Sequence, residues 1–200
     1  MSMIPTKQQS GFALLITILV LSVVVAVTLA IVELSLKQLK LSVDSTDSEV
    51  AFHAANAGLE CARYTRRKES DDFESGAVVT FECFGSVATN VTKQTSLGFM
   101  TTPSNAQVYR YKRDIEWGAA PNQRCTSMDI ITIAADSVIT IGGPLTQSLK
   151  NRIVGYEDDF KTCEAGERCT IMSVIGYSSA CSNNATSSPG VLKREILLEL

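Results

Sequence analysis

Residues 12–32 read FALLITILVLSVVVAVTLAIV, a run of 21 residues with no charge, proline or glycine. Fifteen of them are Leu, Ile, Val or Phe. At roughly −0.3 to −0.6 kcal/mol each, these side chains supply about −4 to −9 kcal/mol toward membrane insertion. As a helix the run covers roughly 31 Å, the thickness of a bilayer's hydrocarbon core. The run therefore predicts a transmembrane helix over residues 12–32.

The rest of the 200-residue chain is far more polar than this run. Eighteen basic and 21 acidic side chains give a formal net charge of −3. This balance argues against direct nucleic-acid binding, which depends on clustered Lys and Arg. Hydrophobic residues make up 45% and charged residues 20% of the chain, which argues against disorder. We expect a membrane-anchored protein with one soluble domain.

A cleaved secretory signal peptide is the competing interpretation of the run. Such a peptide has an apolar core of about 7–15 residues that ends in a small-x-small cleavage site. Here the run is longer, and residues 33–40, ELSLKQLK, follow it without that pattern. We expect the apolar segment to be retained.

The helix is expected to continue beyond the membrane. No Gly or Pro occurs between Phe12 and Ala57, so nothing intrinsic breaks a helix there. Apolar residues recur at spacings of three, four or seven, which predicts one amphipathic stripe over residues 33–67. The stripe consists of Leu36, Leu39, Val43, Val50, Ala54, Ala57, Cys61 and Tyr64.

Two motifs carry a resemblance to a known family. Residues 1–11, MSMIPTKQQSG, form a short polar leader that ends in Gly11 immediately before Phe12. This junction resembles the processing site of type IV pilins and type II secretion pseudopilins. The resemblance implies that a prepilin peptidase cuts after Gly11 and methylates the new N-terminal Phe12. It also implies that the apolar helix is kept as the core of a filament.

The second motif lies further along the expected helix. Residues 48–64, SEVAFHAANAGLECARY, are similar to the A-F-x-A-A-x-A-G-x-E-x-A segment of PilX-like minor pilins. Together the motifs cover residues 8–66, about a third of the chain. They imply a minor pilin-like subunit of a type IV pilus or pseudopilus. Its implied partners are other pilin subunits, the prepilin peptidase and the assembly platform in the membrane.

One position departs from the family pattern. Major pilins carry a Glu at the fifth mature residue, thought to pair with the N-terminal amine of a neighbouring subunit. Counted from Phe12, that position is Ile16. Within the family, the missing carboxylate is typical of a minor subunit.

The remaining residues, 68–200, predict an extracytoplasmic β-rich domain. Residues 70–72 are expected to form a loop, and strand-like runs follow between Gly, Pro, Asn and Ser residues. We expect an α+β fold in which a small antiparallel sheet packs on the long N-terminal helix, as in pilins. The predicted strands cover residues 77–84, 107–115, 129–134, 137–141, 169–177 and 191–200.

Six cysteines, an even number, all follow the apolar run and are compatible with three disulfides in an oxidising compartment. Fifteen pairings are open. Closure between Cys163 and Cys169 would be local, and Cys61 has Cys83 or Cys125 as a partner that would pin the sheet to the helix. A zinc site is disfavoured because no C-x2-C pair occurs and the chain has one His. The candidate disulfide cysteines are Cys61, Cys83, Cys125, Cys163, Cys169 and Cys181.

No cofactor, metal or enzymatic activity is expected. His53 is placed in mid-helix, and no nucleophile motif or phosphate-binding loop occurs. The acidic clusters at residues 71–72 and 157–159 offer oxygen ligands for Ca²⁺, but solvated turns are the favoured interpretation. The alternative to a pilus subunit is a single-pass surface protein with a disulfide-stabilised ligand-binding domain.

The two signals for topology disagree. Lys7 precedes the span, whereas Lys37 and Lys40 follow it, so the positive-inside rule favours a cytoplasmic domain. The cysteines favour an extracytoplasmic domain, and together with the leader they outweigh one lysine. We expect a single-pass protein of the cytoplasmic membrane that later joins a pilus or pseudopilus on the cell surface.

Overall fold

The computed structural model describes residues 10–83, 85, 88–119, 123–181 and 192–200. The chain divides into two compact units, residues 1–45 and residues 46–200. The helix α1 (Ser10–Lys68) supplies the described part of the first unit and the beginning of the second.

Helix α1 is 59 residues long. The absence of Gly and Pro between Phe12 and Ala57 lets it form without interruption. Its last turn carries Arg66, Arg67 and Lys68, where the helix dipole favours positive charge. The predicted end near Arg67 lies one residue from the observed end.

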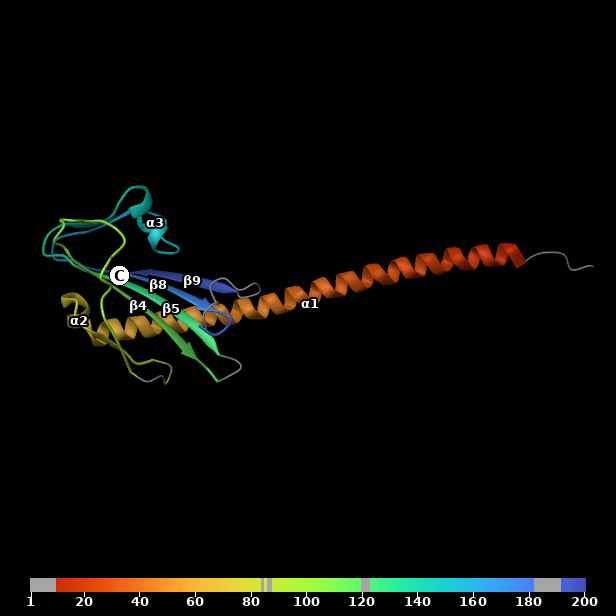
Figure 1. Ribbon diagram of the computed structural model, residues 1–200, viewed down its shortest axis with the longest axis horizontal. Coiled ribbons are helices and arrows are strands. Elements are labelled where there is room, and N and C mark those ends of the chain that lie inside the picture. The colour runs from red at the N-terminus through yellow and green to blue at the C-terminus, as the bar shows by residue number, and fades with distance from the viewer. Residues whose placement is uncertain (1–9, 84, 86–87, 120–122, 182–191) are drawn as a thin grey trace, which may run out of the picture. The chain divides into compact units, whose positions relative to one another are not determined.

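Three antiparallel sheets follow α1, and Figure 1 labels the strands of the largest one. The largest has the order β4–β5–β8–β9, from β4 (Gln107–Trp117), β5 (Arg124–Ala134), β8 (Arg168–Tyr177) and β9 (Lys193–Glu199). The second is β3 (Thr101–Thr102), β6 (Ile139–Gly142) and β7 (Phe160–Cys163). The third pairs β1 (Val79–Phe81) with β2 (Thr89–Val91). A long apolar helix plus antiparallel sheets confirms the α+β layout.

The strand predictions succeed for the four long strands and for two of the five short ones, β1 and β6. Each of the six predicted runs overlaps one observed strand, although β5 begins at Arg124, before the predicted residue 129. β2, β3 and β7 have no counterpart among the predictions, because two to four residues carry too little alternation to be detected. Short helical segments were missed too: α2 (Ser70–Ser75), the 3₁₀ turn η1 (Leu145–Gln147) and α3 (Leu149–Arg152).

The predicted loop at residues 70–72 is wrong, because α2 begins at Ser70. α2 forms there because Phe73 is fully buried and packs edge-on against Tyr111, with ring centroids 4.9 Å apart.

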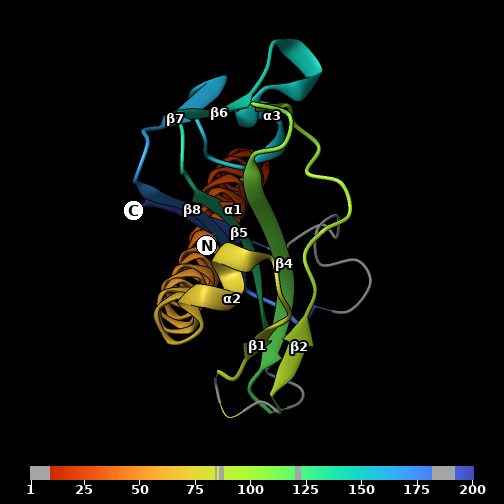
Figure 2. The same cartoon turned by 90° about the vertical axis from the view of Figure 1, so that its left-hand side faces the viewer.

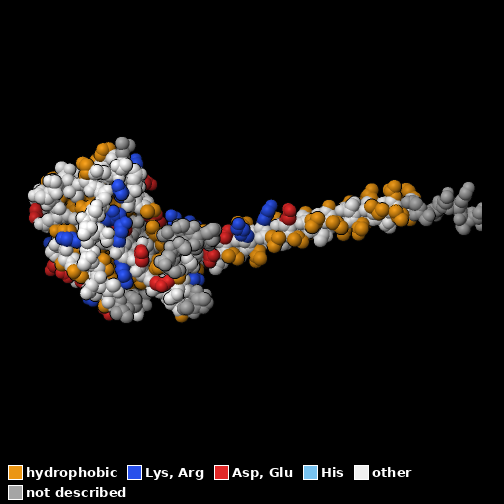
Figure 3. Space-filling model, viewed as in Figure 1, with side chains coloured by type: hydrophobic (Ala, Val, Ile, Leu, Met, Phe, Trp, Pro, Cys, Tyr) orange, Lys and Arg blue, Asp and Glu red, His pale blue; other side chains and the backbone are white. Residues whose placement is uncertain are grey.

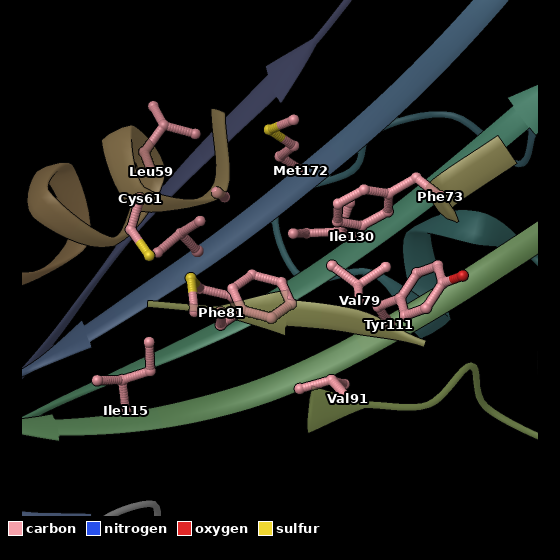
Figure 4. Packing of buried hydrophobic residues seen from close by; sticks show 13 residues of the cluster. Leu59, Cys61, Phe73, Val79, Phe81, Val91, Tyr111, Ile115, Ile130 and Met172 are labelled. Atoms are coloured by element: carbon pink, nitrogen blue, oxygen red, sulfur yellow. The ribbon is translucent and has the colours of Figure 1, made fainter. Parts of the chain in front are cut away.

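The four-stranded sheet contributes to a hydrophobic core on each face, although Lys112, Asp114 and Glu116 of β4 are exposed. On one face α1, α2 and the β1–β2 pair enclose a cluster that includes Leu59, Phe73 and Met172 (Figure 4). On the other face β6, β7 and α3 (Figure 2) cover a cluster that includes Ile131, Ile141 and Leu149. β5 and β8 therefore contribute side chains alternately to two cores, as expected for a sheet covered on both sides.

The predicted amphipathic stripe of α1 is only partly confirmed, since its members Ala54 and Cys61 are buried and others are not. Tyr64 is 58% exposed, and Leu36, Leu39 and Val43 are exposed as well. The buried face is made of smaller residues: Ala51, Ala54, Ala55, Gly58, Leu59, Cys61, Ala62 and Thr65. The prediction missed Ala51, Ala55, Gly58 and Ala62 because close approach to the sheet selects small side chains, which carry a weak hydrophobic signal.

Candidate functional site

The first candidate site is the apolar surface of α1 over residues 12–32. Every side chain of this run is exposed, with Phe12 at 73% and Leu21 at 64% (Figure 3). The hydroxyls of Thr17, Ser22 and Thr28 donate to backbone carbonyls three or four residues earlier, at 2.7–2.8 Å. The polar side chains of the run are thereby satisfied within the helix. By length and composition, α1 can cross a membrane.

The predicted processing junction lies at the beginning of α1. Leader residues 1–9 fall outside the described residues, whereas Gly11 belongs to the backbone of α1. Phe12 and Ile16 both lie on the exposed apolar surface, Ile16 at 44%. The cleavage after Gly11 and the role of Ile16 therefore stay predictions.

The second candidate site is the seam where residues 51–62 of α1 pack on the sheet. Thr126 of β5 donates its Oγ1 hydrogen to the Ala54 carbonyl at 3.0 Å. The same Oγ1 accepts a hydrogen bond from Trp117 Nε1 at 3.1 Å. Because Thr126 is fully buried, these bonds fix how the helix lies on the sheet.

Two glycines bring the helix and the sheet into backbone contact at this seam. A Cβ on Gly58 would collide with Thr126 and lie 2.8 Å from Val174 Cγ1. On the sheet side, a Cβ on Gly176 would collide with the backbone of Ala51 and Ala55. The chain therefore needs glycine at both positions.

The seam gives a physical reason for the second sequence motif. Within residues 51–62, the small residues Ala51, Ala54, Ala55, Gly58 and Ala62 face the sheet and are buried. Phe52, in contrast, is 49% exposed. Sequence reasoning missed Gly176, although a glycine inside a strand is a known sign of close backbone approach.

Three disulfides stabilise the unit of residues 46–200. Cys61 on α1 pairs with Cys83, one of the two partners considered. Cys163 pairs with Cys169 across the β7–β8 turn, and Cys125 on β5 pairs with Cys181. The Cys61–Cys83 bond joins α1 covalently to the chain just beyond β1.

A buried ion pair links the sheet to the loop at Leu97 and to the end of α3. Arg110 of β4 donates from Nε and Nη2 to both carboxylate oxygens of Asp129, at 2.8 and 2.6 Å. Its guanidinium also donates to the Leu97 and Arg152 carbonyls, at 2.7 and 3.0 Å. The arginine thus satisfies polar groups from three segments. Sequence reasoning missed this pair, because 19 residues separate the partners and no motif marks them.

Tyr111 fixes α2 in a similar way. Its hydroxyl donates to the Ala77 carbonyl at 2.9 Å and lies 3.3 Å from the Asp72 carbonyl. Burial, with a smaller contribution from Tyr109 and Asp72, raises the pKa of Tyr111 to about 12. The phenol therefore stays protonated at neutral pH and acts as a donor.

The remaining candidates for chemistry have structural roles. His53 is exposed, with its Nε2 3.6 Å from Glu49 on the same helix. A hydrogen bond from Ser148, with Lys150 nearby, lowers the pKa of Asp159. Cys163, Glu167 and Cys169 come close together, but both cysteines are in a disulfide and offer no thiolate to a metal. Asp71 lies in the first turn of α2, where the helix dipole favours its charge.

The larger cavities are open and mostly polar. One of about 510 Å³ lies beside Thr95, Phe99 and Arg152, and one of about 440 Å³ lies beside Glu74, Asp136 and Arg168. The smaller of the two is also lined by Ser75, whose hydroxyl donates to the Asp72 backbone carbonyl.

No family model, curated protein or solved structure matches the chain.

Proposed function

We propose that this chain is a minor pilin-like structural subunit of a type IV pilus or type II secretion pseudopilus. In this proposal a prepilin peptidase cuts after Gly11 and methylates Phe12, and the subunit assembles through α1. Its partners are other pilin subunits and the assembly platform. Before assembly, the subunit is anchored in the cytoplasmic membrane with residues 46–200 on the extracytoplasmic side. The disulfides fit an oxidising extracytoplasmic compartment.

One observation carries the proposal: a single helix has an exposed apolar surface at one end and a small-residue seam at the other. A simple membrane anchor needs only about 20 apolar residues. Here α1 runs for 59 residues and is built into the domain it carries. That construction suits a subunit held in a bilayer first and packed among other helices later.

The test is N-terminal mass analysis of the full chain, produced with and without a prepilin peptidase. We expect loss of residues 1–11 and a methylated Phe12 only when the peptidase is present. Gly11→Val should block the cleavage, whereas the neighbouring Ala13→Val should not. An intact leader in both samples, or normal processing of Gly11→Val, contradicts the proposal and favours the anchored ligand-binding protein.

A further inference from the structure

The cavity of about 510 Å³ carries one charged side chain, that of Arg152. Its other polar side chains are three hydroxyls and one amide, from Thr95, Ser96, Thr146 and Gln147. All five side chains are exposed, and no Asp or Glu lines the cavity among the described residues. We name this space the Arg152 cavity. It combines one positive charge with several neutral hydrogen-bonding groups.

Arg152 has no carboxylate partner in the part of the chain that the structure describes. The segments outside that part contain no Asp or Glu, so they have no acidic side chain to offer. The Nε group of Arg152 donates to the Thr146 carbonyl at 2.9 Å, which fixes the guanidinium on one side. This arrangement leaves the two Nη groups for an anion from outside the chain.

The two walls of the Arg152 cavity are held by the same buried side chain. Arg110 Nη1 donates to the carbonyl of Leu97 in one wall, at 2.7 Å. Arg110 Nη2 donates to the carbonyl of Arg152 in the other wall, at the end of α3 (Figure 2), at 3.0 Å. Asp129 in turn holds Arg110 through both carboxylate oxygens. The cavity is therefore formed before a ligand arrives, which reduces the cost of ordering it on binding.

Gly98 lies between the guanidinium groups of Arg152 and Arg110. A Cβ at this position would lie 3.7 Å from Arg152 Nη1 and 3.6 Å from Arg110 Nη1. Asp129 neutralises Arg110, whereas the charge of Arg152 is left without a counterion from the described residues. Because Gly98 has no side chain, the space beside the Arg152 guanidinium stays open to a negatively charged group.

We propose that the Arg152 cavity binds an acidic sugar, that is, a saccharide unit that carries a carboxylate. The planar guanidinium of Arg152 pairs with the carboxylate through its Nη groups, as the geometry of arginine favours. The hydroxyls of Thr95, Ser96 and Thr146 and the amide of Gln147 bind the sugar hydroxyls, since each can both donate and accept. A volume of about 510 Å³ lies within the usual range for small-molecule sites.

Simpler ligands would use only part of the Arg152 cavity. Acetate and inorganic phosphate have the charge but lack the sugar hydroxyls, whereas glucose has the hydroxyls but lacks the charge. An apolar acid would find little apolar surface, because Phe99 is 8% exposed and Leu97 is partly buried. An acidic sugar is the ligand class that uses both the charge and the neutral polar groups.

The test measures binding of glucuronate to the full-length chain in micelles of a detergent without a sugar headgroup. Saturation-transfer difference NMR gives the affinity at constant ionic strength, since salt screens the contact with an exposed arginine. Glucose is titrated in the same way, and acetate and inorganic phosphate are added as competitors of glucuronate. We expect glucuronate to bind roughly tenfold more tightly than each of the three, because each lacks several of the hydrogen bonds.

Variants of Arg152 test the role of the guanidinium. Arg152→Gln should weaken glucuronate binding by roughly tenfold or more, because it removes a charge-assisted hydrogen-bonded pair. Arg152→Lys should retain part of the affinity, because the charge remains while the planar fork is lost. Arg67→Gln, which removes an exposed arginine outside the cavity, should leave the affinity unchanged. Thermal unfolding confirms that each variant is folded.

A matched pair of variants at Gly98 tests the position of the ligand carboxylate. Gly98 has a φ of +78°, a conformation that Asp and Asn tolerate better than most residues. Gly98→Asp supplies a carboxylate of the chain itself beside Arg152, whereas Gly98→Asn supplies a side chain of the same shape without the charge. We expect glucuronate to bind roughly tenfold more weakly to Gly98→Asp than to Gly98→Asn.

The proposal is overturned if glucuronate does not bind, or if it binds Arg152→Gln as tightly as the wild type. Competition by acetate or phosphate as strong as that of glucuronate itself would show a site for charge alone and would overturn the sugar assignment. Equal affinity of Gly98→Asp and Gly98→Asn would overturn the placement of the carboxylate. None of these readouts depends on cleavage after Gly11, so failure here is distinguishable from failure of the proposed function.

Discussion

Gly58 shows at the scale of one residue why α1 lies so close to the sheet. It is buried where a side chain would collide with Thr126. Thr126 cannot withdraw without giving up its hydrogen bonds to Ala54 and Trp117. The close packing of Gly58 on Thr126 and the hydrogen bonds of the buried Thr126 hydroxyl therefore depend on one another.

Replacement of Gly58 by Val should lower the free energy of unfolding by about 2–3 kcal/mol, because the seam has no room for the added methyl groups. The measurement is denaturant unfolding of the full chain in detergent. His53→Val, on the exposed side of the same helix, should change stability by no more than about 0.5 kcal/mol. Equal stability of both variants would show that the seam is not close-packed.

Glu195 and Glu199 both lie on β9, but the pKa of Glu195 is raised and the pKa of Glu199 is lowered. Burial raises the pKa of Glu195, despite a hydrogen bond from Ser173 and the charge of Lys193. At Glu199 burial acts in the same direction, but bonds from Lys161 and Tyr156 outweigh it and lower the pKa. The folded state thus favours the protonated form of Glu195 and the ionised form of Glu199.

These directions predict opposite pH dependences for two Gln variants. Stability from the raised pKa of Glu195 is present below the unfolded value near 4.5 and is lost as the pH rises through the folded value. Glu195→Gln should therefore be more stable than the wild type at pH 7, with the gain vanishing below pH 4.5. Glu199→Gln should be less stable at pH 7, with the loss vanishing in acid. Unfolding curves across the range from pH 3 to pH 8 measure both effects, and a common sign would contradict the assignment.

At the scale of elements, the three disulfides close chain segments of very different length. Sequence separations are 56 residues for Cys125–Cys181, 22 for Cys61–Cys83 and 6 for Cys163–Cys169. By chain entropy, their loss costs about 4, 3 and 2 kcal/mol respectively. By this criterion the Cys125–Cys181 disulfide, which closes the longest chain segment, is the most stabilising of the three.

Paired Cys→Ala variants should follow that order. Removing Cys125 and Cys181 should lower the unfolding midpoint most, and removing Cys163 and Cys169 should lower it least. Thermal unfolding of the three double variants, each with its other two disulfides intact by mass analysis, measures the ranking. A larger loss from the Cys163–Cys169 pair than from the other two contradicts the chain-entropy account.

At the scale of the whole molecule, the parts of the fold that follow from local pattern could be predicted. Residues 12–32 and the absence of Gly and Pro beyond them were sufficient for α1, and alternation revealed the long strands. The seam could not be found this way, because Ala and Gly carry almost no hydrophobic signal. Nor could the Arg110–Asp129 pair, because a contact between strands depends on their register. For the processing junction, the sequence remains the only source of the prediction.

The seam also determines how residues 46–200 would carry a mechanical load. A pull along α1 reaches the sheet through contacts spread over residues 51–62, so they are loaded in shear together rather than opened one at a time. The Cys61–Cys83 disulfide is covalent, so it still joins α1 to the chain beyond β1 at forces that break the noncovalent contacts. Under tension, α1 should therefore stay attached to the chain beyond β1 even after the hydrogen bond from Thr126 to Ala54 has broken.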